Sequence, residues 1–231
     1  HVNIAMPFVT PNKNMISPVI PDVGGKNLIE LAEYIRELGQ KVKNTNVNQL
    51  LRDVSKQERT HDLLRGKLSV IPSLLKGLMG KHKVKKLKGK AKKEYYSIPE
   101  SDRLIPKDIM SGTVIVSNIG SINRGLKGNF TVFDLIPPQV LAIGISSIQK
   151  RPGVYEDKET GEDKIGIRKI LPCCFMFDHR AFDYAHSIPF IRSLDNIFSD
   201  PEKFFKSVVP AELFKKKQQV KQNSQKAESL A

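Results

Sequence analysis

The residues best suited to chemistry in this sequence are a histidine and an aspartate four positions apart, His179 and Asp183. The apolar segment Ile170–Phe177 before them predicts a buried strand, and the amphipathic run after Asp183 predicts a helix. His179 therefore comes where a strand ends, in a turn that can direct its ring toward a cleft. An imidazole with its ordinary pKa of about 6.5 can remove a proton from a thiol, whose pKa is about 8.5. His179 is a candidate general base, although taken alone it also fits a structural histidine.

A serine comes near the end of a second predicted strand. Residues 112–120 are rich in β-branched side chains, which favours a central strand, and Ser117 lies at its end. Ser117 is either a functional hydroxyl or an ordinary strand-end serine. Asp183 also has two interpretations, because an aspartate before a helix can cap it. Arg180 favours a structural ion pair over a ligand contact. Three other histidines match no motif and receive no role: His61, His82 and His186.

The segments that must position these residues are strands separated by turns. Strand signals occur in residues 2–10, 15–20 and 140–145, and residues 130–135 predict another extended piece. Pro18 favours an edge strand or a bulge. The charged stretch Tyr155–Gly166 predicts a hairpin loop, and Ile167–Phe177 would complete that hairpin.

Helix signals occur at both ends of the chain. Asn27 predicts the cap of an amphipathic helix that ends near residues 43–44, and Asp200 predicts the start of a last short helix. The helix after Asp183 contains Pro189, which should kink it unless the proline lies in the first turn. We find no zinc-ligand, phosphate-loop or dinucleotide-binding spacing in the sequence.

The net charge of +14 on 231 residues comes mainly from two segments. Lysines crowd into residues 76–93, and others lie in the tail, residues 210–231, which predicts disorder or a loose helix. Residues 45–105 predict an inserted helical segment with a solvated basic end. A sharper interpretation is a basic amphipathic hairpin that contacts an anionic membrane or an acidic partner through Lys76–Lys93. Nucleic acid is disfavoured, because few aromatic residues are interleaved with the lysines.

Composition and cysteine usage exclude several classes of protein. Hydrophobic residues make up 39% of the sequence, enough for the core of one domain with an appendage. No apolar run approaches the ~20 residues of a membrane span, and no secretory signal opens the chain. Cys173 and Cys174 are adjacent, so in a strand they point to opposite faces, and we expect small core residues without a disulfide. We expect a cytoplasmic protein, or a mitochondrial matrix protein in a eukaryote, that is not secreted.

Three motifs, which occur in the order that they have in a known protein family, carry a resemblance to that family. Residues 178–183, Asp-His-Arg-Ala-Phe-Asp, resemble the D-H-R-x-x-D-G signature of the dihydrolipoyl acyltransferase catalytic domain of 2-oxoacid dehydrogenase complexes. Residues 112–120 are similar to the family's G-T-F-T-[IL]-S-N-[LI]-G strand. Residues 136–144 are similar to its N-P-P-Q segment and the apolar strand after it. The resemblance covers residues 1–44 and about 105–209.

The resemblance implies an α/β fold, a two-layer sandwich of a mixed sheet with helices on one face, similar to chloramphenicol acetyltransferase. Residues 1–44 and 106–209 would form the acyltransferase domain. It would move an acyl group between coenzyme A and a dihydrolipoyl or other small acceptor. By the resemblance His179 is the general base, Ser117 stabilises the oxyanion, and Asp183 orients the site.

The resemblance also implies partners. Coenzyme A would be a substrate, and a lipoyl group would be carried by another domain or chain. In trimers of this family the base and the oxyanion donor approach each other across a subunit interface. We therefore expect a homotrimer or larger oligomer with its active site at that interface, and components of a 2-oxoacid dehydrogenase complex as partners.

Three features depart from the family's pattern. Tyr184 replaces the glycine after the second aspartate, residues 45–105 replace a short linker, and the chain opens at His1 without the N-terminal part of the family's domain. We therefore expect the chain to be N-terminally incomplete. Two alternative hypotheses remain: a catalytically inactive structural or scaffold homologue of the same fold, and a membrane-surface acyltransferase that uses residues 68–93.

Overall fold

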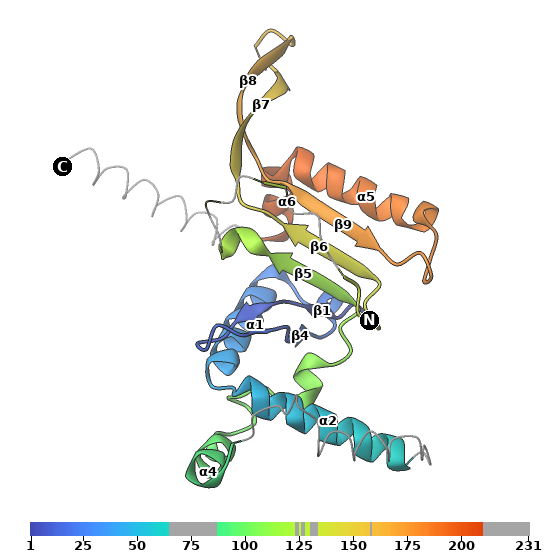
Figure 1. Cartoon of the computed structure of the whole chain (residues 1–231). Coiled ribbons are helices and arrows are strands. Elements are labelled where there is room, and N and C mark those ends of the chain that lie inside the picture. The colour runs from blue at the N-terminus through green and yellow to red at the C-terminus, as the bar shows by residue number, and fades with distance from the viewer. Residues whose placement is uncertain (65–86, 123–124, 126–127, 130–133, 158, 210–231) are drawn as a thin grey trace, which may run out of the picture. The chain divides into compact units, whose positions relative to one another are not determined.

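A computed structural model of the chain describes residues 1–64, 87–122, 125, 128–129, 134–157 and 159–209 (Figure 1). The chain divides into two compact units. The larger unit consists of residues 1–24 and 35–178, and the smaller unit of residues 25–34 and the chain from residue 179 onward. The larger unit holds all the strands that the structure describes, and the smaller unit holds the turn that contains His179.

A five-stranded mixed sheet organises the larger unit. Its order is β4 (Val19–Ile20), β1 (Ile4–Ala5), β5 (Val114–Asn118), β6 (Leu141–Ile145) and β9 (Cys173–Phe177). β1 and β5 are parallel, as are β5 and β6, whereas the outer strands β4 and β9 are antiparallel to their neighbours. The predicted α/β class with a mixed sheet is confirmed. The edge position of β4 also confirms the expectation from Pro18, because a residue without an N–H suits an edge.

Each of the two predicted N-terminal strands is divided in two. β1 is followed by β2 (Phe8–Val9), and β3 (Met15–Ile16) is followed by β4. β2 pairs with β3 in a separate two-stranded sheet, while β1 pairs with β4. Prolines lie at both divisions, Pro7 and Pro18. Since proline cannot donate to a strand ladder, each segment changes sheet there.

The predicted hairpin after β6 is longer than the sequence suggested, and its second strand ends earlier. β7 (Gln149–Glu156) pairs with β8 (Asp163–Ile170). The predicted loop Tyr155–Gly166 was therefore too long, because pairing continues to the Glu156–Asp163 row. The continuous strand predicted through Phe177 was also wrong, because Pro172 interrupts it and β9 joins a different sheet. All five residues of β9 are half-buried rather than buried.

The first helix, α1 (Leu28–Lys43), follows its prediction closely. The Asn27 side-chain oxygen accepts hydrogen bonds from the N–H groups of Ile29 and Glu30, at 2.9 and 3.0 Å. The Glu30 carboxylate in turn accepts from the N–H of Asn27 at 2.9 Å, which completes a capping box. Leu38 and Val42, on the predicted apolar stripe, are buried.

Two further helices lie in the predicted insert, α2 (Val47–Leu64) and α4 (Gly89–Ser97). Lys76 to Lys86 of the basic run lie outside the described residues, as does the Pro72 interruption. The four basic residues of this run that are described are all exposed: Lys88, Lys90, Lys92 and Lys93. The proposed basic surface is therefore described only at its C-terminal end.

The smaller unit contains α5 (Tyr184–Ser199) and α6 (Pro201–Val208). Asp200 caps α6 as predicted, because its carboxylate accepts a hydrogen bond from the N–H of Lys203 at 3.0 Å. Pro189 is the sixth residue of α5, beyond the first turn, and the helix continues through it with one N–H fewer. Short 3-10 turns occupy Val23–Gly25, Pro106–Ile109 and Ile119–Ser121. None of the described helices has the length and apolar character needed to cross a membrane.

A buried threonine joins the end of α1 to the chain that leads into β5. The Thr45 hydroxyl donates to the carbonyl of Lys41 at 2.6 Å and accepts from the N–H of Leu104 at 2.8 Å. Leu104 is fully buried, and Thr45 is 8% exposed. Water therefore cannot easily replace this hydroxyl.

We predict that Thr45→Val destabilises the chain by about 1–3 kcal/mol, because the buried N–H of Leu104 then lacks its acceptor. Thr45→Ser keeps the hydroxyl and should remain closer to the wild type. Urea denaturation of both variants measures the difference. A stability of Thr45→Val equal to that of the wild type would contradict the role of the hydrogen bond.

Candidate active site

The register of three neighbouring strands fixes the position of Ser117. Ser117 on β5 lies opposite Gly144 on β6, and Cys174 on β9 lies opposite the same glycine. Ser117 is half-buried and is followed by Asn118, the last residue of β5. The predicted place of this serine, at the end of a β-branched strand, is therefore confirmed.

The same register places the residue before His179 at the other end of β6. The N–H of Asp178 donates to the carbonyl of Val140, the residue before β6, at 3.0 Å. Ser117 pairs with Gly144, four residues further along. At the usual rise per residue this separates the two ends by about 13 Å. Ser117 and Asp178 thus lie toward opposite ends of one central strand.

A cavity of about 480 Å³ opens beyond the ends of β5 and β6, directly after Ser117. Its lining combines serine hydroxyls and an amide with apolar side chains. The lining residues are Asn118, Gly120, Ser121, Ile145, Ser146, Ser147, Ile148 and Leu171. The N–H of Ser121 donates to the side-chain oxygen of Asn118 at 3.1 Å, which holds the short turn at its edge.

The close approach of Gly120 to β6 shapes this cavity. A side chain at Gly120 would place its Cβ 2.5 Å from the carbonyl oxygen of Ser146, closer than real Cβ atoms approach. Glycine therefore lets the turn after β5 close against residues 146–147.

In the smaller unit, His179 and Asp183 line one cavity of about 430 Å³. The other lining residues are Arg180, Ala181, Phe182 and His186. Asp183 precedes α5 in an extended conformation, so its predicted position as the N-cap is confirmed. Its carboxylate makes no capping hydrogen bond. The ion pair predicted for Arg180 remains a prediction.

His186 shares this cavity, although the sequence analysis assigned it no role. The backbone N–H of His186 donates to the backbone carbonyl of Asp183 at 3.0 Å, in the first turn of α5. Its spacing from Asp183 was the available signal, because residues three apart lie on the same side of a helix. A second imidazole thus lines the same cavity as the candidate base.

The two cysteines form no disulfide, as expected from their adjacency. Both are half-buried, so they are less enclosed than the core residues that were predicted. Burial raises the pKa of the Cys173 thiol above its ordinary value. Cys173 therefore resembles an inert structural thiol more than a reactive nucleophile.

A sequence model of the 2-oxoacid dehydrogenases acyltransferase family (catalytic domain) matches residues 83–206, more than half of the chain. The chain belongs to this family. The match includes all three candidate residues of the acyltransferase site, Ser117, His179 and Asp183. It does not include residues 1–44, so the resemblance of that segment remains a prediction. Membership agrees with the mixed sheet and with the predicted chloramphenicol-acetyltransferase-like class.

Curated relatives include dihydrolipoyllysine-residue acetyltransferase components of pyruvate dehydrogenase complexes. The chain is 33% identical over 97 residues to that of Mycobacterium bovis, a match that covers 41% of this chain and 16% of the relative. It is 33% identical over 94 residues to that of Corynebacterium glutamicum, a match that covers 41% of this chain and 13% of the relative. It is 29% identical over 109 residues to that of Zymomonas mobilis, a match that covers 47% of this chain and 22% of the relative. The aligned part is a small fraction of each relative.

Similar solved structures have low sequence identity to this chain. A dihydrolipoamide acetyltransferase of Azotobacter vinelandii is 20% identical, with a TM-score of 0.46 and coverage of 87% of this chain and 55% of that one. A probable dihydrolipoamide acetyltransferase of Listeria monocytogenes is 18% identical, with a TM-score of 0.44 and coverage of 83% and 53%.

We predict that Gly120→Ala destabilises the chain by about 1–3 kcal/mol and distorts the cavity after Ser117, because the added Cβ overlaps a backbone carbonyl. Gly128→Ala is a matched control, since a Cβ there meets nothing within 4 Å. Thermal denaturation of both variants tests this. A Gly120→Ala melting temperature equal to that of the control would contradict the overlap.

Proposed function

We propose that this chain is a CoA-dependent acyltransferase that moves an acyl group between coenzyme A and a dihydrolipoyl group or another small acceptor. The observation that carries the proposal is the family match over residues 83–206, which contains the Asp-His-Arg-x-x-Asp motif. The cavity that His179 and Asp183 share supports it, because a general base must face space where a substrate thiol can lie.

The proposed roles follow from the chemistry of thioester exchange. His179 accepts the proton of the attacking thiol, and the thiolate forms a C–S bond to the thioester carbonyl carbon. The carbonyl oxygen becomes an oxyanion, to which the Ser117 hydroxyl donates a hydrogen bond. When the intermediate collapses, the other C–S bond breaks and the protonated imidazole returns the proton to the departing thiolate. Asp183 orients the imidazole or the turn that carries it.

The strand register favours a site built from two chains. A base and an oxyanion donor must both come within about 3 Å of the reacting group. Ser117 and Asp178 are anchored about 13 Å apart along one strand, an arrangement that suits a shared substrate poorly. We therefore propose a homotrimer or larger oligomer in which His179 of one chain faces Ser117 of its neighbour. A lipoyl group on another domain and partners from a 2-oxoacid dehydrogenase complex belong to the same proposal.

The replacement of the family's glycine by Tyr184 does not by itself favour the inactive alternative. Tyr184 is the first residue of α5. Among described non-glycine residues, positive φ angles occur at Lys13, Asp22 and Ser111 and not at Tyr184. The turn therefore does not use the left-handed conformation for which a glycine would be needed.

We predict that His179→Ala lowers kcat/KM by about 10²-fold or more, because the general base is lost. Ser117→Ala should lower kcat by about 10²- to 10³-fold, because an oxyanion donor is lost. Both losses of activity are measured in the full-length protein by the release of free CoA from acetyl-CoA, with dihydrolipoamide as the acceptor. His1→Ala, which changes an exposed histidine that contacts Asp22, is the control.

Equal rates in the wild type and in His179→Ala would contradict the role of this histidine. A wild-type protein that neither binds CoA nor releases thiol would instead support the inactive scaffold homologue.

Mixed assemblies test whether two chains share a site. If His179 and Ser117 act from different chains of a cyclic oligomer, co-expressed His179→Ala and Ser117→Ala chains should regain about a quarter of the wild-type activity by random mixing. Each pure variant should stay inactive. No recovery in mixed assemblies of confirmed composition would show that one chain supplies both groups.

A further inference from the structure

The hairpin β7–β8 presents one face on which every side chain is exposed. Side chains alternate between the two faces of a strand, and directly paired residues share a face. The register therefore assigns four rows to this face, which we call the outer face: Lys150 with Lys169, Pro152 with Ile167, Val154 with Ile165, and Glu156 with Asp163. All eight residues are exposed.

The exposure of the two middle rows is large for apolar side chains. Ile165 is 79% exposed, Ile167 80% and Val154 65%. The opposite face of the hairpin is more covered, since Gln149 is buried and the Arg168 guanidinium lies 4.6 Å from the centre of the Tyr155 ring. Exposed β-branched residues gathered on one face of a hairpin indicate a surface that another molecule covers.

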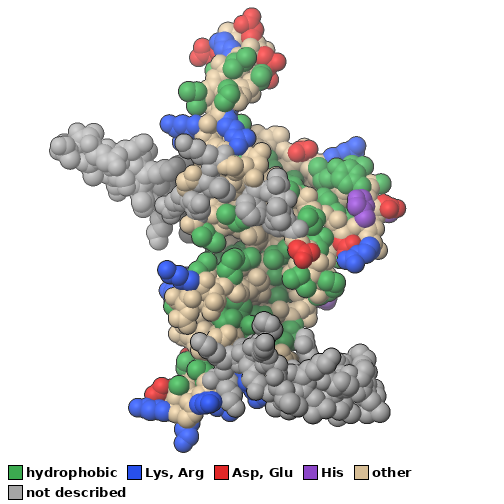
Figure 2. All heavy atoms as spheres, viewed as in Figure 1, with side chains coloured by type: hydrophobic (Ala, Val, Ile, Leu, Met, Phe, Trp, Pro, Cys, Tyr) green, Lys and Arg blue, Asp and Glu red, His purple; other side chains and the backbone are tan. Residues whose placement is uncertain are grey.

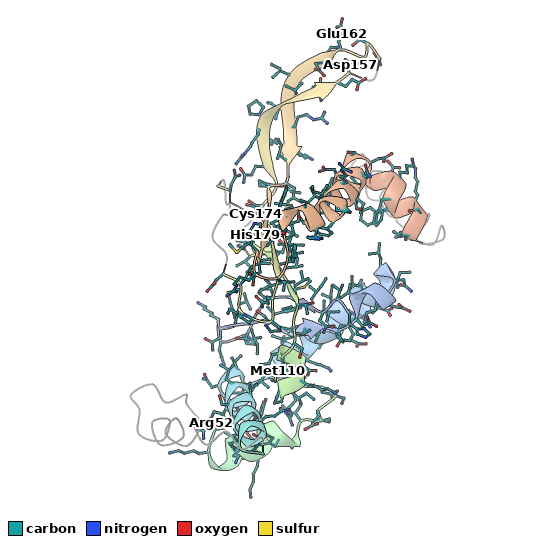
Figure 3. The ribbon with its side chains drawn as sticks, turned by 90° about the vertical axis from the view of Figure 1, so that its right-hand side faces the viewer. Arg52, Met110, Asp157, Glu162, Cys174 and His179 are labelled. Carbon is teal, nitrogen blue, oxygen red and sulfur yellow. The ribbon has the colours of Figure 1, made fainter. Side chains whose placement is uncertain are left out.

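The charges on the outer face are separated along the hairpin. The two lysines lie at its base, near the sheet, and the two carboxylates lie at the last paired row before the tip. Figure 2 shows basic side chains at the base of the hairpin and hydrophobic ones in the middle; at the tip acidic side chains gather together with a basic one. Figure 3 labels Asp157 and Glu162 at that tip. Among the described residues, none of the four charged side chains of the outer face takes part in an ion pair.

We propose that the outer face binds the outer face of a second copy of this chain in a two-fold, antiparallel contact. A two-fold axis through the centre of the four rows brings the lysine row of each chain onto the acidic row of the other. It also brings the two apolar rows of each chain together. The order basic, apolar, apolar, acidic is complementary to itself in this orientation alone, which is what an isologous contact requires.

This contact is independent of the proposed acyltransferase site. A three-fold interface joins two different surfaces of each chain, whereas the outer face pairs with itself. The contact is also small, with eight residues a side against the roughly 20–30 of a standard interface, so we expect weak, concentration-dependent association.

Charge exchange tests the orientation. The acidic variant, Lys150→Glu with Lys169→Glu, and the basic variant, Glu156→Lys with Asp163→Lys, each place like charges opposite each other. The exchanged variant carries all four substitutions and restores opposite charges. The control, Lys13→Glu with Lys107→Glu, makes the same charge change as the acidic variant at exposed positions off the hairpin. Sedimentation velocity of the full chain over a range of concentrations measures association, and circular dichroism checks folding.

We expect the wild type, the control and the exchanged variant to show the same association step. The acidic and basic variants should each lose at least about tenfold in affinity for that step. Mixed in equal amounts, these two variants should associate with each other and recover it. Ile165→Thr with Ile167→Thr keeps the β-branching and should also weaken the step.

Three results would overturn the proposal. The first is a wild type whose sedimentation shows no association step at any concentration. The second is an unchanged step in the acidic and basic variants. The third is a step that those variants lose but that neither their mixture nor the exchanged variant restores.

Discussion

The pairing of β6 on both of its edges is the constraint on which the rest of the larger unit depends. β6 is parallel to β5 on one side and antiparallel to β9 on the other, with five paired rows on each side. A slip of one residue would turn every side chain of a strand to the opposite face, so this register is strongly specified. It aligns Ser117 with Gly144 and fixes Asp178 at the start of β6. The separation of Ser117 from Asp178 along β6 is thus a property of the sheet and not of their side chains.

Elements with strong local signals could be predicted from the sequence. The Asn27 and Asp200 caps, the β-branched β5 and the apolar β6 each depend on residues within a few positions of one another, and each forms where predicted. The position of Asp183 before α5 follows from the same kind of signal. The motif around His179 carried the resemblance to the family, and it lies within the residues that the family model matches.

Features that depend on distant partners could not be predicted in the same way. The apolar run Ile170–Phe177 is continuous in sequence, yet β8 and β9 belong to different sheets. The sheet that each strand joins depends on its partner strand: β8 pairs with β7, and β9 pairs with β6. The periodicity of the sequence does not reveal these partners. The half-buried state of β9 has the same origin, because it is an edge strand with a single neighbour among the described strands. His186 was missed because it belongs to no motif, although its spacing from Asp183 in the predicted helix was available as a signal.

The order of charges on the hairpin separates two explanations for its exposed isoleucines. An exposed apolar strand face is a hazard, since it can pair with other chains without specificity, and proteins commonly protect such faces with charges. Charges placed only to protect would work best with one sign at both ends, because identical chains would then repel each other in every orientation. The hairpin instead has lysines at one end and carboxylates at the other. That order repels a parallel arrangement of two copies and attracts an antiparallel one, so it selects one mode of contact rather than preventing all of them.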